Sequence, residues 1–232
     1  MNIIDIVILI IMSISMIVGL YNGMILSALH AASFFLSWLA SVIFYPYITK
    51  LILDLFPSLL NVIVLYAEGS THIPSVEERM TGIKSLSPEM ISEIVDKAQL
   101  PNPFSRILIS DFSQTLEGIG TLGEYFDTTV AIVIINIFSF LLLFFLVKLA
   151  FIIIVSISKT VVNLPVLKKF DGAAGAGFGI IRGFFIIYLI FALIPVLLVL
   201  APTDIFTELL DGSKLADFFH YTNIFTSFVR GR

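Results

Sequence analysis

The sequence predicts an all-α integral membrane protein of about four transmembrane helices in two hairpins, with amphipathic interfacial helices and a soluble helical insert. Hydrophobic residues make up 58% of the chain and charged residues only 13%, whereas a soluble domain carries about a quarter charged residues. The mean hydropathy is +1.05. Several apolar runs are also long enough to cross the hydrocarbon core of a bilayer, which takes about 20 residues.

The first hairpin is predicted from the N-terminal residues. Ile3–Leu20 is almost unbroken Ile, Val, Leu and Met. We expect it to be a retained helix, because Asp5 stands where a secretory signal carries a base and no small-residue cleavage site follows. Asn22-Gly23 then predicts a turn. A second span is expected from about Met24 to Tyr45, closed by Pro46.

The weakly polar residues of the second span step by three and four along the chain, so they share one helical face. They are Ser27, His30, Ser33, Ser37 and Ser41. Such a face packs against another helix or lines a polar cavity, because lipid does not solvate it. A proton relay could use His30 together with Lys148, but a hydrogen-bonded packing role is the favoured interpretation of the histidine.

The next stretch, Lys50–Leu65, has polar residues on one face and apolar residues on the other. This pattern predicts an amphipathic helix lying on the membrane surface. Pro57 near its middle argues against a straight span, although a fifth transmembrane helix remains the alternative.

Residues 67–127 are expected to form an acidic, water-exposed and mostly helical insert. From Glu68 to Asp127 there are ten acidic and four basic residues, a net charge of −6. Ser87-Pro88 predicts a helix start, with serine as the N-cap and proline at the first position. An apolar stripe follows in that helix, consisting of Ile91, Ile94, Val95 and Ala98.

The second hairpin is predicted from two further apolar runs. Thr128–Ser158 is longer than a bilayer requires, and Lys148 inside it implies tilt, a break or snorkelling to an interface. The last span runs from Gly172 to Ala201, and the tail after it is expected to form short helices on the membrane surface. The predicted segments are therefore 1–66, 67–127, 128–201 and 202–232.

The distribution of basic residues predicts the orientation in the membrane. The connector between the third and fourth spans carries Lys159, Lys168 and Lys169, with Arg182 just inside the next helix. Positive charge near span ends stays cytoplasmic. Both termini and the insert are then expected on the opposite, extracytoplasmic side.

A glycine-rich segment opens the last span and predicts a helix-packing seam. Its members are Gly172, Gly175, Gly179 and Gly183. Glycine at every fourth residue lets another backbone approach closely. The functional interpretation is a seam at a site or hinge, and plain helix packing is favoured over it. Gly19–Gly23 has the same Gly-x-x-x-Gly pattern as Gly179–Gly183. Chance similarity is favoured over a repeated two-helix unit as its explanation.

Arg182 is a candidate functional charge, because a guanidinium in a span is costly unless it is paired or reaches an interface. Its expected partner is Asp171 or a lipid phosphate. A topology anchor at the interface is the alternative interpretation, and the residues alone favour neither.

Enzymatic and cofactor chemistry finds no support in the sequence. The chain has no cysteine, which excludes disulfides and thiolate ligands. It contains no metalloprotease or nucleophile-elbow motif. We therefore expect no catalytic, metal or cofactor site, and the net charge of −4 gives no reason to expect nucleic acid as a partner.

The chain resembles the colicin V production protein (CvpA) family of bacterial inner-membrane proteins. The likeness rests on Ile4-Asp5, on the Gly19–Gly23 turn, and on the segment from Asp171 to Gly183 that includes Arg182. Asn22 and the long acidic insert depart from the family pattern. The resemblance implies about four spans in the inner membrane and a role in producing or exporting a peptide toxin, and in envelope maintenance.

Three functional hypotheses follow. The first is a non-enzymatic protein for toxin production and envelope homeostasis, in contact with the lipid bilayer and with anionic lipid. The second is a small transporter or channel subunit that works as a homo-oligomer. The third is a membrane scaffold whose insert recruits an envelope protein.

Overall fold

The computed structural model describes residues 2–112, 118–158, 171–200, 210 and 212–231. Their secondary structure is helical, apart from an isolated antiparallel bridge between Gly82 and Thr121. Among these residues, three helices are long and apolar enough to cross a membrane: α1 (Ile3–Leu55), α6 (Leu122–Ser158) and α7 (Asp171–Leu200). The prediction of an all-α membrane protein is therefore confirmed, whereas the count of four spans is not. The three predicted connector lysines lie outside the described residues.

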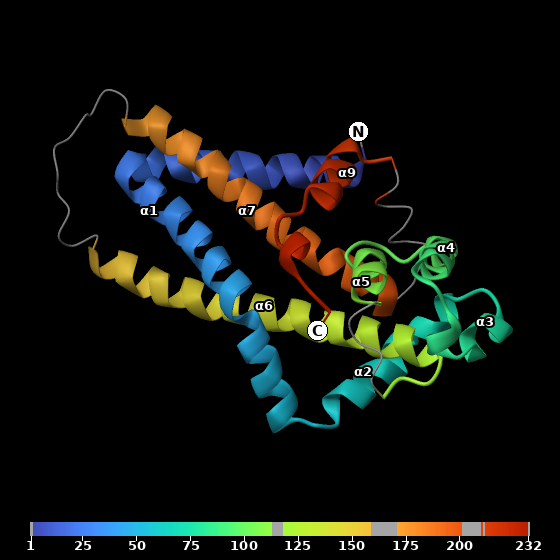
Figure 1. Ribbon diagram of the computed structural model, residues 1–232. Coiled ribbons are helices and arrows are strands. Elements are labelled where there is room, and N and C mark those ends of the chain that lie inside the picture. The colour runs from blue at the N-terminus through green and yellow to red at the C-terminus, as the bar shows by residue number, and fades with distance from the viewer. Residues whose placement is uncertain (1, 113–117, 159–170, 201–209, 211, 232) are drawn as a thin grey trace. The chain divides into compact units, whose positions relative to one another are not determined.

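Helix α1 contains both of the first two predicted spans, joined by a kink at Gly23. Gly23 has φ 74° and ψ 176°, a region of backbone conformation that is essentially restricted to glycine. The chain turns back there, so that residues 3–22 form a first arm and residues from 24 onward a second arm (Figure 1). Helix α1 does not end at Pro46, which was expected to close the second span, but continues to Leu55; the end of the span itself stays a prediction. Proline kinks a helix without necessarily ending it.

The chain folds into two compact units whose boundaries lie inside the long helices. The first unit comprises Met1–Phe44, Phe140–Ala192 and Asp204–Phe225, and the second comprises Tyr45–Ser139, Leu193–Thr203 and Thr226–Arg232. These units group residues that are close in space. The predicted segments 1–66, 67–127, 128–201 and 202–232 follow changes in composition along the chain, and they stay a prediction.

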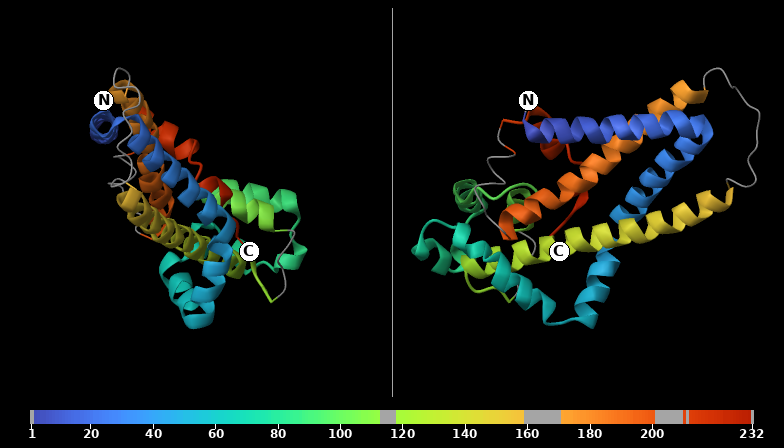
Figure 2. Two further views of the ribbon diagram at one scale, coloured as in Figure 1. Left: turned by 90° about the vertical axis from the view of Figure 1, so that its left-hand side faces the viewer. Right: turned by 180° about the vertical axis from the view of Figure 1, so that it is seen from behind.

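The first unit is built around the two arms of α1, α7 and the C-terminal half of α6, with the short helix α9 (Lys214–Tyr221) beside the N-terminal end of α1 (Figure 2, right). Phe219 of α9 packs against Phe184, Tyr188 and Phe191 of α7. Its side chain is 3% exposed. One face of α9 is therefore buried against α7, and the position of the tail on the membrane surface stays a prediction.

Phe225, which follows α9, forms the centre of an aromatic cluster in the first unit. Its ring centroid lies 5.6 Å from those of Phe140 and Phe144 and 6.2 Å from that of Phe185. Phe225 has no solvent exposure. The tail therefore supplies core residues to the membrane helices.

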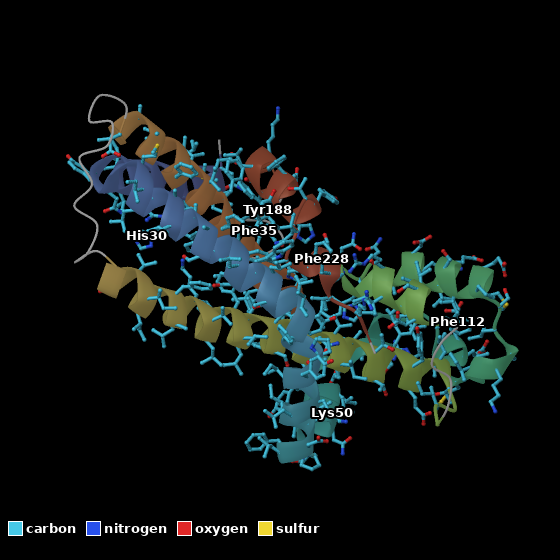
Figure 3. The ribbon with its side chains drawn as sticks, turned by 60° about the vertical axis from the view of Figure 1, so that its left-hand side comes forward. His30, Phe35, Lys50, Phe112, Tyr188 and Phe228 are labelled. Atoms are coloured by element: carbon cyan, nitrogen blue, oxygen red, sulfur yellow. The ribbon has the colours of Figure 1, made fainter. Side chains whose placement is uncertain are left out.

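The second unit begins with the last turns of α1, where Figure 3 shows Lys50. The predicted single amphipathic helix Lys50–Leu65 is wrong, because the chain leaves α1 after Leu55 and resumes in α2 (Leu59–Ala67). Pro57 explains the break, since proline disfavours the helical conformation of the residue before it.

The insert in the second unit is mostly helical, as predicted. It contains the 3₁₀ turns Gly69–His72 and Ile83–Ser85, and the helices α3 (Val76–Met80), α4 (Pro88–Ala98) and α5 (Phe104–Asp111). Helix α4 begins at the predicted position, with the Ser87 hydroxyl accepting from the Met90 amide. The predicted apolar stripe of α4 is buried, and α4 packs against α5.

The insert core continues onto the first turns of α6. The Tyr125 hydroxyl donates to the Leu108 carbonyl at 2.7 Å, and the Tyr125 ring meets Phe112 edge-on. Phe104 at the start of α5 is completely buried. The described end of the chain docks in the same unit, where Asn136 of α6 donates to the carbonyls of Arg230 and Gly231.

Candidate functional site

The first unit holds a seam in which α7 and the first arm of α1 approach backbone to backbone. A Cβ atom added to Gly19 would lie 2.8 Å from the Gly179 Cα, and one added to Gly175 would lie 2.8 Å from the Gly23 carbonyl carbon. Real Cβ atoms do not come so close to backbone. We call these contacts, together with those of Gly183, the glycine seam.

The four glycines of the predicted seam do not contribute equally. Gly183 lies against Met12 and Ser15, where an added Cβ would be 2.8 Å from the Met12 Sδ. At Gly172 an added Cβ would make only ordinary van der Waals contact, because it would lie 3.6 Å from the Leu20 carbonyl oxygen. Gly177, on another face of α7, has open space around it. Close approach is therefore confined to three of the four predicted positions.

Ser15 joins the two helices by hydrogen bonds across the seam. Its hydroxyl donates to the Gly179 carbonyl at 2.8 Å. The same hydroxyl accepts from Nε of Arg182 at 3.0 Å, and Nη2 of Arg182 donates to the Ser15 carbonyl at 3.2 Å. Ser15 is 2% exposed. The guanidinium of Arg182 is thus fixed on the first arm of α1 by a serine that the sequence analysis did not single out.

Asp171 does not pair with Arg182 but caps the kink in α1. Its Oδ1 accepts from the Met24 amide at 2.7 Å, at the N-terminus of the second arm. Asp171 also lies in the first turn of α7, so one carboxylate faces two helix N-termini, where negative charge is stabilising. A Cβ atom on Gly23 would collide with this carboxylate. The kink therefore requires glycine for both conformation and space.

Arg182 contacts the first arm well inside it rather than at its end. Ser15 lies eight residues before Gly23, which is about 12 Å along a helix that rises 1.5 Å per residue. The whole first arm is about 30 Å long by the same measure, close to the thickness of the hydrocarbon core. This depth disfavours the interpretation of Arg182 as an anchor at the interface.

Lys148 of α6 is folded into the first unit. Its ammonium group donates to the Ser33 hydroxyl and, at 3.4 Å, to the carbonyl of His30, which Figure 3 shows on the second arm of α1. It also lies 3.7 Å from the centroid of the Phe34 ring. Lys148 is 9% exposed. Snorkelling, one of the expected solutions, is therefore wrong for this lysine, because hydroxyl, carbonyl and ring contacts hold it inside.

The serines of the second arm are buried, and their hydroxyls bond to nearby backbone. Ser27 donates to the Gly19 carbonyl, Ser33 to that of His30, Ser37 to that of Ser33 and Ser41 to that of Ser37, at 2.7 to 3.0 Å. All four are at most 3% exposed, whereas His30 is half-buried. This face of the second arm is therefore a packing surface. Each of the four serine hydroxyls already donates its proton to a backbone carbonyl.

Asp5 holds the opposite end of the first arm to α9. Its Oδ1 accepts from the Ser213 hydroxyl at 2.5 Å and from the Leu215 amide at 3.3 Å. Ser213 is the N-cap of α9. A carboxylate at a helix N-terminus is stabilising. In the sequence, Asp5 argued against a secretory signal and belonged to the family resemblance, but nothing in its spacing pointed to a segment more than 200 residues away.

An apolar groove lies beside the kink in the first unit. It has a volume of about 390 Å³ and is lined by Met24, Ile25, Ala28, Leu29, Ala32 and Phe178. In the part of the chain that the structure describes, no group of three or more His, Asp or Glu side chains could hold a metal ion.

Comparison with known proteins gives one match. The family model described as colicin V production protein matches residues 108–223, which is half of the chain. The match includes Asp171, the glycine-rich segment and Arg182, whereas Ile4-Asp5 and the Gly19–Gly23 turn lie outside it. No curated protein and no solved structure matches the chain.

Proposed function

The chain belongs to the colicin V production protein family, and on that basis we propose that it is a non-enzymatic inner-membrane protein supporting production or export of a peptide toxin and envelope homeostasis. It crosses the membrane four times, with the two arms of α1 as the first hairpin and α6 and α7 as the second. The kink at Gly23 supports this count, because each arm of α1 is long enough to span the bilayer on its own.

The observation that carries the proposal is the position of Arg182. This arginine lies inside the family match and is bound to Ser15 in the depth of the helices. A charged residue at such depth is costly and generally serves a function. The glycine seam brings Ser15 and Arg182 together, so seam and charge form one functional element.

Replacement of Arg182 tests this proposal in cells. We expect Arg182→Ala to remove support for toxin release while the protein remains inserted, because the seam glycines stay in place. Arg182→Lys should restore part of the function, since it keeps the charge. Secreted toxin activity would be measured together with the amount of protein in the membrane fraction. Lys84→Ala, an exposed charge in the insert, is the matched control, and full function of Arg182→Ala would refute the proposal.

We further propose that both termini and the insert are extracytoplasmic. The basic connector supports this orientation through the positive-inside rule. The cysteine-free sequence allows a direct test with single cysteines at Ser85 and Ser158 and an impermeant maleimide on intact cells. Labelling at Ser85 alone is expected, and labelling at Ser158 alone would invert the orientation. Ser85 is exposed, which makes it a suitable site in the insert.

The transporter hypothesis receives less support than the lead proposal. It needs the serine face of the second arm to line a path, but those hydroxyls donate to backbone carbonyls of α1. The scaffold hypothesis has the insert as its candidate binding module, and no observation singles out a partner.

A further inference from the structure

The last described residues of the second unit, 226–231, are held there through their backbone. We call them the docked tail. Arg106 of α5 makes three of the hydrogen bonds. Its Nη1 donates to the Ser227 carbonyl at 2.7 Å, and its Nη2 donates to the carbonyls of Thr226 and Val229 at 3.2 and 3.0 Å. One guanidinium thus binds three carbonyls around the short 3₁₀ turn at the start of the docked tail.

Two further helices, α1 and α6, complete the contacts. Asn136 of α6 donates from Nδ2 to the carbonyls of Arg230 and Gly231 at 2.6 and 3.0 Å. Its Oδ1 accepts from the Thr49 hydroxyl of α1 at 2.8 Å, which fixes the amide with its N–H groups toward the docked tail. The Tyr45 hydroxyl of α1 accepts from the Arg230 amide at 2.9 Å. Asn136 is 5% exposed, so its N–H groups need an acceptor.

The end of the docked tail has a short pattern of buried and exposed positions. Val229 is 3% exposed and Gly231 is buried, whereas Arg230 between them is exposed. A Cβ atom on Gly231 would collide with the Asp111 carboxylate and lie 2.7 Å from Cγ2 of Ile107. The pocket therefore fits an aliphatic residue followed two positions later by glycine. In peptide recognition, backbone hydrogen bonds supply affinity and such buried positions supply selectivity.

The contacts to the docked tail lie near the membrane surface rather than in its middle. Asn136 stands 22 residues before Ser158, the end of α6, which is about 33 Å along the helix. The hydrocarbon core is about 30 Å thick. Arg106 is exposed. A peptide can therefore reach these residues without entering the hydrocarbon core.

We propose that Tyr45, Arg106 and Asn136 form a binding site for a peptide segment, that the docked tail occupies it as an internal ligand, and that a separate peptide with the aliphatic-x-glycine pattern can replace the tail. Exchange conserves the hydrogen bonds, because a second backbone offers the same carbonyls. Covalent attachment gives the tail an effective concentration of the order of millimolar, so a free peptide binds well only once the tail is displaced. A segment of the exported peptide is the natural occupant, and only this identification rests on the proposed function.

The test measures binding of a fluorescein-labelled peptide with the sequence of residues 222–231 by fluorescence anisotropy. The unmodified full-length chain is compared in nanodiscs with Gly231→Val, whose own tail no longer fits. We expect Gly231→Val to bind the peptide at least about tenfold more tightly, because its tail competes less. Adding Arg106→Gln should weaken this binding at least about tenfold, the scale of lost hydrogen bonds to a charged group. Adding Lys97→Gln, in the exposed ion pair of α4, should change nothing.

A peptide that itself carries Gly231→Val is the matched control, and deletion of residues 226–232 is a second way to empty the site. Circular dichroism verifies that each variant keeps its helices. The inference is overturned if the two peptides bind equally, or if the unmodified chain binds the peptide as tightly as the emptied variants do. It is also overturned if the folded emptied variants bind neither peptide, or if both variants lose their helices, since the tail would then be a fixed part of the fold.

The oligomeric state distinguishes a separate peptide from a second copy of the chain. A dimer of the unmodified chain that Gly231→Val dissociates would show that two copies exchange their tails, and it would overturn the inference of a separate peptide. A monomer in both cases is expected. None of these experiments involves a toxin, so this inference and the proposed function can fail separately.

Discussion

The glycine seam and the insert solve the problem of helix packing by opposite means. In the seam, α7 meets the first arm of α1 through backbone atoms around Gly19, Gly175 and Gly179. In the insert, α4 and α5 pack through large apolar side chains, of which Phe104, Ile91 and Leu108 are completely buried. The predicted surroundings of the two regions, water around the insert and lipid around the long helices, would produce this difference. Water drives apolar side chains together, whereas lipid offers no such force, so close approach and hydrogen bonds must hold helices in a membrane.

Filling the seam is expected to have the largest effect. Gly179→Leu would force a side chain against the Met16 Cα, where even a Cβ would lie at 3.1 Å. Backbone cannot move aside as a flexible side chain can, so we expect α7 to separate from the first arm although both stay inserted. Thermal unfolding followed by Trp38, which lies in the first unit, would show loss of the cooperative transition.

Gly177→Ala is the matched control in the same helix. An added Cβ there meets nothing within 4 Å, and alanine favours the helix by roughly 1 kcal/mol over glycine. The transition should be unchanged or slightly higher. Equal damage from both substitutions would mean that α7 is sensitive to any added side chain, and that the seam has no special role.

A cavity in the insert should have a smaller and local effect. Phe104→Ala removes a fully buried ring, a change that generally destabilises by about 3–5 kcal/mol. We expect faster proteolysis of residues 68–112 with little change in the Trp38 transition. Equal loss in both readouts would show that the insert and the membrane helices unfold together, and the contrast between the two regions would then fail.

The sequence predicted the seam of α7 but not its partner. The spacing of Gly175, Gly179 and Gly183 indicates a face for close packing, and all three positions are used in that way. Gly19 is part of a similar Gly-x-x-x-Gly segment, and the sequence alone favours chance as the explanation of that similarity. In the structure these two glycine segments lie against each other. Spacing within a helix shows which face packs, but it carries no information on which distant segment fills it.

The partners of the polar side chains also could not be predicted from spacing within one helix. Asp171 was expected to pair with Arg182, yet eleven residues along one helix separate them by about 16 Å. The amide that Asp171 binds belongs to Met24, and it is free only because the kink interrupts α1. Likewise, Lys148 was expected to imply tilt, a break or snorkelling to an interface, and the serine and ring that hold it lie on another helix. Local helix starts such as Ser87-Pro88 depend on neighbouring residues alone, and that one was predicted correctly.

A disulfide across the glycine seam tests the packing of α7 against the first arm of α1 most directly. A Cβ at Gly183 would lie 3.3 Å from the Ser15 Cβ, just below the range of about 3.5–4.5 Å found in disulfides. The native chain has no cysteine, so the pair Ser15→Cys with Gly183→Cys can be compared directly with Ser15→Cys and Gly177→Cys in membranes treated with oxidant. We expect rapid crosslinking of the first pair and little of the second. Failure of the first pair to crosslink, or equal crosslinking of both, would contradict the packing of α1 against α7 through the glycine seam.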